Sequence, residues 1–324
     1  MMYVKVAVGF VLLLVAAEYM IRGAVALARK MNISPLVIGM TVIAVGTSAP
    51  ELVVGLQAGL SGVGGLALGN VVGSNIANVL LVLGAAGLIA PIVSKEGSLL
   101  RDGIVLFGGS VLFTFFCMQD SITRIPGIVL VVAMTGFLLA SYRREHDQGG
   151  PDAELHLEEV EEVGSLPASN WIIWGALIGG IAGILIGADL LVDGGVTIAR
   201  DYGVSEEVIG LTLIALGTSL PELAASVVAA LRGHADVAIG NVVGSNLFNI
   251  LGIAGIVAIV TPLPVSSQIA SFDVWVMLAA TALMMPLLIW GWRLNRVVAS
   301  GFLACYVGYI GLQAYGVERA LAGF

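Results

Sequence analysis

The sequence has very few charged residues for its length. Only 11% of its 324 residues are Asp, Glu, Lys or Arg, whereas a soluble globular domain carries about 25%. Hydrophobic residues make up 58% of the chain and the mean hydropathy is +1.02, so water cannot be the solvent for most of it. The 43 glycines agree, because small residues let membrane helices approach closely. These values predict a multi-pass membrane protein.

Cysteine and histidine are also scarce. Cys117 and Cys305 both lie in apolar runs, which argues against a disulfide or a thiolate metal site. The three histidines, His146, His156 and His234, lie in loops without a metal-ligand pattern, and no HExxH motif occurs. No histidine lies at membrane depth to act as a base. We therefore expect neither an enzyme nor a bound cofactor.

The net charge of −8 comes from one short segment. Between Glu145 and Glu162 there are eight carboxylates and no Lys or Arg, and the remainder of the chain is balanced. Nothing indicates a nucleic-acid partner. The segment could bind calcium in a regulatory manner, but it lacks EF-hand spacing, so a solvated linker is the favoured interpretation.

The chain contains one unit written twice. A shift of 171 residues aligns the halves without a gap: 13 of 19 positions in 34–52 are identical to their counterparts in 205–223. In 69–80, 9 of 12 positions match 240–251. Such agreement identifies an internal duplication.

Apolar runs predict an all-α membrane protein with ten transmembrane helices. The expected spans are 4–28, 34–60, 65–89, 102–118, 124–141, 170–199, 205–231, 236–260, 272–291 and 298–317. Five spans per copy is an odd number, so the copies are expected as two inverted five-helix repeats, 1–141 and 170–324, joined by an acidic linker loop at 142–169. Inverted repeats suit alternating access, but symmetry alone cannot name a substrate.

Loop charges predict the orientation in the cell membrane. With the N-terminus outside, nine loop Lys and Arg residues lie inside and four lie outside, which satisfies the positive-inside rule. Lys5 argues mildly for the opposite orientation.

Two expected spans contain a proline followed by an acid. They read Gly46-Thr-Ser-Ala-Pro-Glu51 and Gly217-Thr-Ser-Leu-Pro-Glu222. Proline has no amide hydrogen, so each helix should loosen and free a backbone carbonyl at mid-membrane. A central carboxylate costs about 2.5–3.5 kcal/mol on insertion scales, so Glu51 and Glu222 are expected to be functional. Carbonyls, hydroxyls and carboxylates are hard oxygen ligands suited to calcium or sodium.

The next span in each half carries a second repeated motif. It reads Gly69-Asn-Val-Val-Gly-Ser-Asn75 followed by Asn78, and Gly240-Asn-Val-Val-Gly-Ser-Asn246 followed by Asn249. The glycines, four residues apart, favour a helix packing seam. The residues Ser74, Asn78, Ser245 and Asn249 are favoured as ligands, because each Ser–Asn pair lies on one helix face.

These four motif blocks, in this order, resemble the paired α-repeats of the calcium/cation antiporter superfamily, and most closely its prokaryotic sodium/calcium exchanger branch. The resemblance implies a sodium/calcium antiporter with four ion sites between spans two, three, seven and eight, in which spans one and six slide across a rigid core. It implies no cofactor and, as partners, calcium ions, sodium ions and the lipid bilayer. We expect a monomer to suffice for transport.

The resemblance also implies the ion ligands by position. Calcium would be held by Glu51 and Glu222 with backbone oxygens of Thr47 and Thr218. Sodium would use the same acids. Its other ligands would be Ser48, Ser74, Ser219, Ser245 and the carbonyls of Ala44 and Ala215. Asn78 and Asn249 would flank the central site.

One departure bears on the coupling ion. Some superfamily members, including potassium-dependent exchangers, carry Asp where this chain has Asn249, and the proton/calcium branch has a different motif in place of the GTS-x-PE motif. A proton- or potassium-coupled calcium antiporter remains the alternative, and a passive calcium channel is a second one. Two carboxylates balance one calcium or two sodium ions, so a third sodium makes exchange electrogenic. Manganese and magnesium stay open as substrates.

Three further acids lie toward the ends of spans one and six. Glu18 and Arg22 are four residues apart and are expected to pair across one helical turn. Asp189 and Asp193 are interpreted, like Glu18, as helix-end or gating residues.

Overall fold

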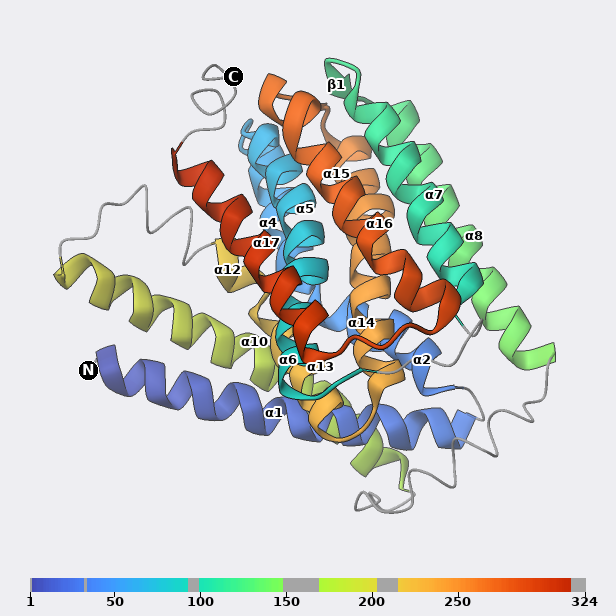
Figure 1. Ribbon diagram of the computed structural model, residues 1–324, viewed down its shortest axis with the longest axis vertical. Helices are drawn as coiled ribbons and strands as arrows, with labels where there is room; N and C mark the ends of the chain where they lie inside the picture. Colours follow the sequence, from blue (N-terminus) through green and yellow to red (C-terminus); the bar gives the residue numbers. More distant parts are fainter. Residues whose placement is uncertain (1, 32–33, 93–98, 148–168, 203–214, 316–324) are drawn as a thin grey trace.

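The computed structural model describes residues 2–31, 34–92, 99–147, 169–202 and 215–315, and these are almost entirely helical (Figure 1). Eight helical stretches in the described part are long and apolar enough to cross a membrane. They are Met2–Met31, Gly64–Ile89, Leu100–Cys117, Arg124–Ser141, Asn170–Ile198, Ala235–Val260, Ile269–Trp290 and Arg296–Tyr315. A ninth results if the bent pair Gly39–Thr47 and Ala49–Leu60 counts as one span. The chain is therefore a multi-pass membrane protein.

The described helices follow the predicted spans to within a few residues at their ends. The exception is the seventh span: its described part begins at α12 (Ala215–Thr218) and continues as α13 (Leu220–Leu231), while residues 205–214 lie outside the described residues. The predicted linker, 142–169, also lies mostly outside the described residues. Its first residues continue helix α8 (Arg124–Asp147). The ten-helix plan in two inverted repeats therefore stays a prediction.

Two spans form the centre of the molecule. The first joins α5 (Gly64–Ala77), the π-helical turn η2 (Asn78–Leu83) and α6 (Gly84–Ile89). The second joins α14 (Ala235–Leu247), η4 (Phe248–Ile253) and α15 (Ala254–Val260). In their most apolar windows 72% and 83% of the residues are buried, against 17–44% for the other single spans. Polar side chains on these two spans are thus kept away from lipid.

The remaining helices surround this centre. The second span comprises α2 (Pro35–Ile38), η1 (Gly39–Ile43), α3 (Ala44–Thr47) and α4 (Ala49–Leu60), and it packs against α5 and α14. Helix α7 (Leu100–Cys117) packs against α16 (Val274–Trp290), which follows η5 (Ile269–Asp273). Helix α8 lies along α15, and α17 (Arg296–Tyr315) lies along α6.

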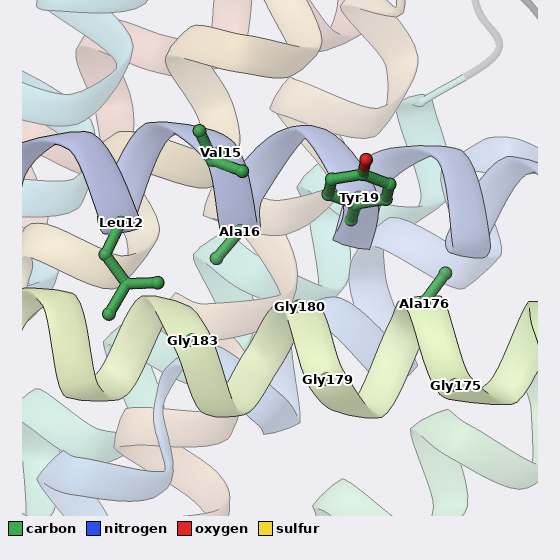
Figure 2. A pocket seen from close by; sticks show the side chains of 9 residues that line it. All are labelled: Leu12, Val15, Ala16, Tyr19, Gly175, Ala176, Gly179, Gly180 and Gly183. Atoms are coloured by element: carbon green, nitrogen blue, oxygen red, sulfur yellow. The ribbon is translucent and has the colours of Figure 1, made fainter.

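Helices α1 (Met2–Met31) and α10 (Asn170–Asp201) form a separate pair that runs obliquely to the other long helices (Figure 1). Their contact depends on glycine: a Cβ on Gly180 would lie 2.7 Å from the Met20 backbone, and one on Gly187 would lie 2.8 Å from the Leu13 nitrogen. The predicted role of glycine in close helix approach is confirmed here. An apolar groove of about 280 Å³ lies along the same seam, between Tyr19 of α1 and Gly179 of α10 (Figure 2).

Two short antiparallel backbone pairings join segments that connect the helices. Strand β1 (Ser121–Ile122) pairs with β2 (Leu263–Pro264) in antiparallel fashion, and Ile92 forms an isolated antiparallel bridge with Leu294. The 171-residue shift carries Ile92 onto Leu263, and it carries the residue after Ile122 onto Leu294. The two contacts are therefore near-equivalents in the duplicated sequence.

Candidate functional site

Both prolines stand at helix breaks, as the sequence predicts. Helix α3 ends at Thr47, Ser48 leaves helical geometry with φ −85° and ψ 10°, and α4 restarts at Ala49 with Pro50 in its first turn. The axis bends by 50° there. The second half repeats the arrangement, with Ser219 at φ −90° and ψ 1° before Pro221 in α13. Each acid thus lies in the first turn of a restarted helix, where exposed amides and the helix dipole favour negative charge.

The two acids are buried and lie on opposed helix breaks. Glu51 and Glu222 are each 1% exposed. Ser48 of the first break donates its hydroxyl to Glu222 Oε1 at 2.8 Å, which places the two breaks side by side. Oε2 of both glutamates is buried without a hydrogen-bond partner. Among the described residues neither carboxylate forms an ion pair, so a charge on either acid has no described cationic side chain to balance it.

More unpartnered polar atoms come from the two central spans. Ser74, Asn78, Ser245 and Asn249 are all buried, as is Ser219 of the second break. The buried atoms without a hydrogen-bond partner include Asn78 Oδ1, both polar atoms of the Asn249 side chain, Ser219 Oγ and Ser245 Oγ. A buried polar atom without a partner is rare and costly. The set is rich in oxygen, which suits hard cations such as sodium and calcium.

The central spans change helix type at the predicted asparagines. The π-helical turn η2 begins at Asn78, and η4 begins one residue before Asn249. Such turns widen the helix and are frequent at functional sites. The sequence predicts only the extent of these two spans, because nothing in the local composition distinguishes a π-turn from an α-helix.

A set of asparagines that the sequence analysis did not propose as ligands connects the repeats. Thr47 donates to Asn241 Oδ1 at 3.4 Å, and Thr218 donates to Asn70 Oδ1 at 3.5 Å. Asn78 Nδ2 donates to Asn246 Oδ1 at 3.1 Å. Each bond joins one half of the duplicated sequence to the other. The signal for Asn70, Asn241 and Asn246 was present, because all three belong to the repeated GNVVGSN motif.

The two expected carbonyl ligands are Ala44 and Ala215, and the structure describes the surroundings of Ala44 more fully. The carbonyl of buried Ala44 accepts the Ser48 amide at 3.0 Å and lies 3.3 Å from the Thr47 hydroxyl. It is therefore engaged within its own helix, and a sodium ion would have to replace or share one of these bonds. Ala215 begins helix α12, and its side chain lies outside the described part.

The glycine seam predicted in the GNVVGSN motif is present at Gly244. A Cβ there would overlap the backbone of Met40 in η1, so α14 and the second span touch backbone to backbone. Gly73 is the counterpart of Gly244, and the counterpart of Met40 is Leu211, which lies outside the described residues.

Two of the three acids interpreted as helix-end residues, Glu18 of α1 and Asp193 of α10, lie in ion pairs. Glu18 accepts Arg22 Nε at 2.6 Å across one helical turn, which confirms the predicted pair. Glu18 also accepts a hydrogen bond of 2.7 Å from Nε of Arg232, the residue that follows α13. Asp193 pairs with Lys5 at 2.5 Å, joining α10 to α1. The first pair lies within α1, the second links α1 to the end of α13, and the third is a largely exposed link between α1 and α10.

Comparison with known proteins gives a consistent assignment. The family described as "Sodium/calcium exchanger protein" matches residues 2–143 and 172–315, which is most of the chain. The putative antiporter CaxA of Alkalimonas amylolytica is 41% identical over 94% of this chain and 96% of its own. The sodium/calcium exchanger MaX1 of Methanosarcina acetivorans is 30% identical over 95% of this chain and 97% of its own.

A solved structure has the same architecture. The sodium-calcium exchanger NCX_Mj superimposes with a TM-score of 0.81 at 30% identity, covering 96% of this chain and 98% of that one. The matched segments include both helix breaks and both central spans. The chain therefore belongs to the sodium/calcium exchanger family of membrane antiporters.

Proposed function

We propose that the protein exchanges sodium for calcium by alternating access, at a site between the two helix breaks and the two central spans. The observation that carries the proposal is the pair of buried carboxylates, Glu51 and Glu222, which lie on opposed breaks without a cationic partner among the described residues. A net charge of −2 in a low-dielectric site favours one divalent ion or several monovalent ions over an empty state.

We assign the ligands by combining the sequence motifs with the buried oxygen atoms. Calcium contacts the two glutamates and the backbone oxygens of Thr47 and Thr218. Sodium uses the same glutamates with the hydroxyls and carbonyls of the breaks and central spans, namely Ser48, Ser74, Ser219, Ser245 and the carbonyls of Ala44 and Ala215. Asn78 and Asn249 flank the central site. The unpartnered oxygens of Ser219, Ser245 and Asn249 support this assignment.

We place the protein in the inner (plasma) membrane with its N-terminus outside, on the distribution of loop Lys and Arg.

We also propose that helices α1 and α10 form the unit that slides to change access. Their oblique course in Figure 1 and their glycine contacts support a separate two-helix body.

A sodium jump on calcium-loaded proteoliposomes tests the coupling. External sodium is expected to release calcium, while equal steps of potassium or a pH gradient release none. Protein-free vesicles control for passive loss, and a calcium ionophore added at the end gives the total releasable calcium. Release driven by potassium or protons alone would favour the alternative coupling, and release without any gradient requirement would indicate a channel.

We propose a stoichiometry of three sodium ions per calcium. The loaded forms then differ by one elementary charge, and the membrane potential acts on that charge with about 2.3 kcal/mol per 100 mV. Reversal potentials measured at fixed sodium and calcium gradients should follow the three-for-one relation. A flux insensitive to a potential clamped with valinomycin and potassium would show electroneutral exchange and contradict it.

A further inference from the structure

Asn241 of α14 connects the two broken spans through one buried amide. Its Nδ2 donates to Ser226 Oγ at 3.0 Å and lies 3.4 Å from the Glu222 carbonyl oxygen, both on α13. Its Oδ1 accepts the hydroxyl of Thr47, the last residue of α3. A single side chain therefore joins the first helix break to the backbone of the acid in the second.

The first repeat lacks half of this arrangement. Asn70, the counterpart of Asn241, accepts the Thr218 hydroxyl at 3.5 Å, but its Nδ2 is buried without a hydrogen-bond partner. The sequence explains the difference, because the 171-residue shift places Gly55 opposite Ser226. Glycine offers no hydroxyl to the asparagine, so the buried donor stays unsatisfied.

A second difference between the repeats also gives Glu222 a contact that Glu51 does not receive from the equivalent residue. Ser48 donates to Glu222 at 2.8 Å, whereas its counterpart Ser219 has an unpartnered Oγ and makes no such bond to Glu51. Glu222 is thus held through both its carboxylate and its carbonyl, whereas among the described residues Glu51 receives neither a bond from Ser219 Oγ nor one from Asn70 Nδ2.

We propose that Asn241 is a positioning residue that holds Glu222 in place for calcium, and that Asn70 performs only part of this task for Glu51. The two acids are consequently unequal ligands: one is preorganised and the other must be ordered when the ion arrives. Ordering a group on binding lowers affinity, and preorganisation raises it. The inference rests on the proposed function, since it concerns affinity at a proposed ion site.

Asn241 also gives the Thr47 proton a second acceptor. The Thr47 hydroxyl lies 3.3 Å from the Ala44 carbonyl and 3.4 Å from Asn241 Oδ1, and it has one proton to donate. A proton donated to Asn241 leaves the Ala44 carbonyl free of the Thr47 hydroxyl and open to a cation. This keeps a positive hydrogen away from the cation.

The missing contact can be built and tested at Gly55. A Cβ there would lie 3.4 Å from the Ile253 and Val257 methyl groups, which is ordinary contact, so Gly55→Ser and its control Gly55→Ala both fit. The serine hydroxyl is expected to accept from Asn70 Nδ2. Relative to Gly55→Ala, Gly55→Ser should lower the half-saturating calcium concentration by up to about fivefold, the factor for the whole free energy of one neutral hydrogen bond, with a maximal rate unchanged within about twofold.

The reverse change is Ser226→Ala, which removes the acceptor from Asn241. It should raise the half-saturating calcium concentration by about fivefold, again with little change in maximal rate. A merely structural role would lower the amount of folded protein or the maximal rate instead. Equal calcium half-saturation for Gly55→Ser and Gly55→Ala, or wild-type half-saturation in Ser226→Ala, would overturn the inference.

A thermal measurement separates this inference from the proposed function. In purified protein without calcium, Gly55→Ser is expected to melt about 2–4 °C above Gly55→Ala, because a buried donor gains its acceptor. Absence of sodium-driven calcium flux in the wild type would reject the proposed function but leave this comparison readable. Equal melting temperatures would reject the Asn70 contact even in a protein that transports normally.

Discussion

Replacing Glu51 or Glu222 by glutamine is expected to reduce sodium-driven calcium transport at least about 100-fold. Glutamine keeps the size of the side chain but removes one of the two negative charges in a site where both acids are 1% exposed. Losing one partner of a buried charge interaction costs about 3–5 kcal/mol, and 1.4 kcal/mol is already a factor of ten. The initial rate of calcium release from proteoliposomes after a sodium jump measures the effect.

Asp120→Asn is the matched control for this experiment. It makes the same charge change at an exposed position between α7 and β1, so transport should remain close to the wild-type rate. Near-normal calcium release in either glutamate variant, with equal amounts of reconstituted protein, would contradict the ion site. Loss in the control as well would indicate a general effect of net charge.

Gly244→Ala is expected to cost about 2–3 kcal/mol of stability and at least tenfold in transport. A single methyl group there overlaps the Met40 backbone, so α14 and η1 must move apart. The displaced segment continues through α3 to Ser48, whose hydroxyl holds Glu222, so the effect reaches the candidate site. Thermal melting and sodium-jump release on the same purified sample measure both consequences.

Gly108→Ala provides the comparison for this substitution. Gly108 is an exposed position in α7 where a Cβ would meet nothing described within 4 Å, and alanine favours helix over glycine by about 1 kcal/mol. That variant should be at least as stable as the wild type and as active. Size-exclusion profiles in detergent show whether Gly244→Ala still folds. A monodisperse Gly244→Ala protein with wild-type melting and transport would refute the backbone contact.

Much of the architecture could be predicted without coordinates because it depends on local physics. Long apolar runs predict membrane helices, and the described helices match them to within a few residues. Prolines without an amide hydrogen predict the breaks before Glu51 and Glu222, and the structure has a break at Ser48 and at Ser219. The Glu18–Arg22 pair follows from helical spacing alone.

The contacts of the asparagines that join the repeats, Asn70, Asn241 and Asn246, could not be predicted in the same way. These residues belong to a glycine-containing motif whose pattern is equally typical of helix packing. Whether each amide meets a threonine, a serine or another asparagine depends on how two distant helices are rotated about their axes. That rotation leaves no trace in the spacing of the motif.

The sequence by itself determined that most of the chain lies in lipid, that it contains a duplication and two helix breaks, and which two acids are buried. All of these depend on composition, on periodicity or on the chemistry of a single residue type. Only the tertiary structure decided that Ser48 reaches Glu222, that Asn241 joins both breaks, and that Gly244 touches the Met40 backbone. The hydrogen bonds from Ser48 and Thr47 link residues 174 and 194 positions apart, so their partners are chosen by the packing of whole helices rather than by any local preference.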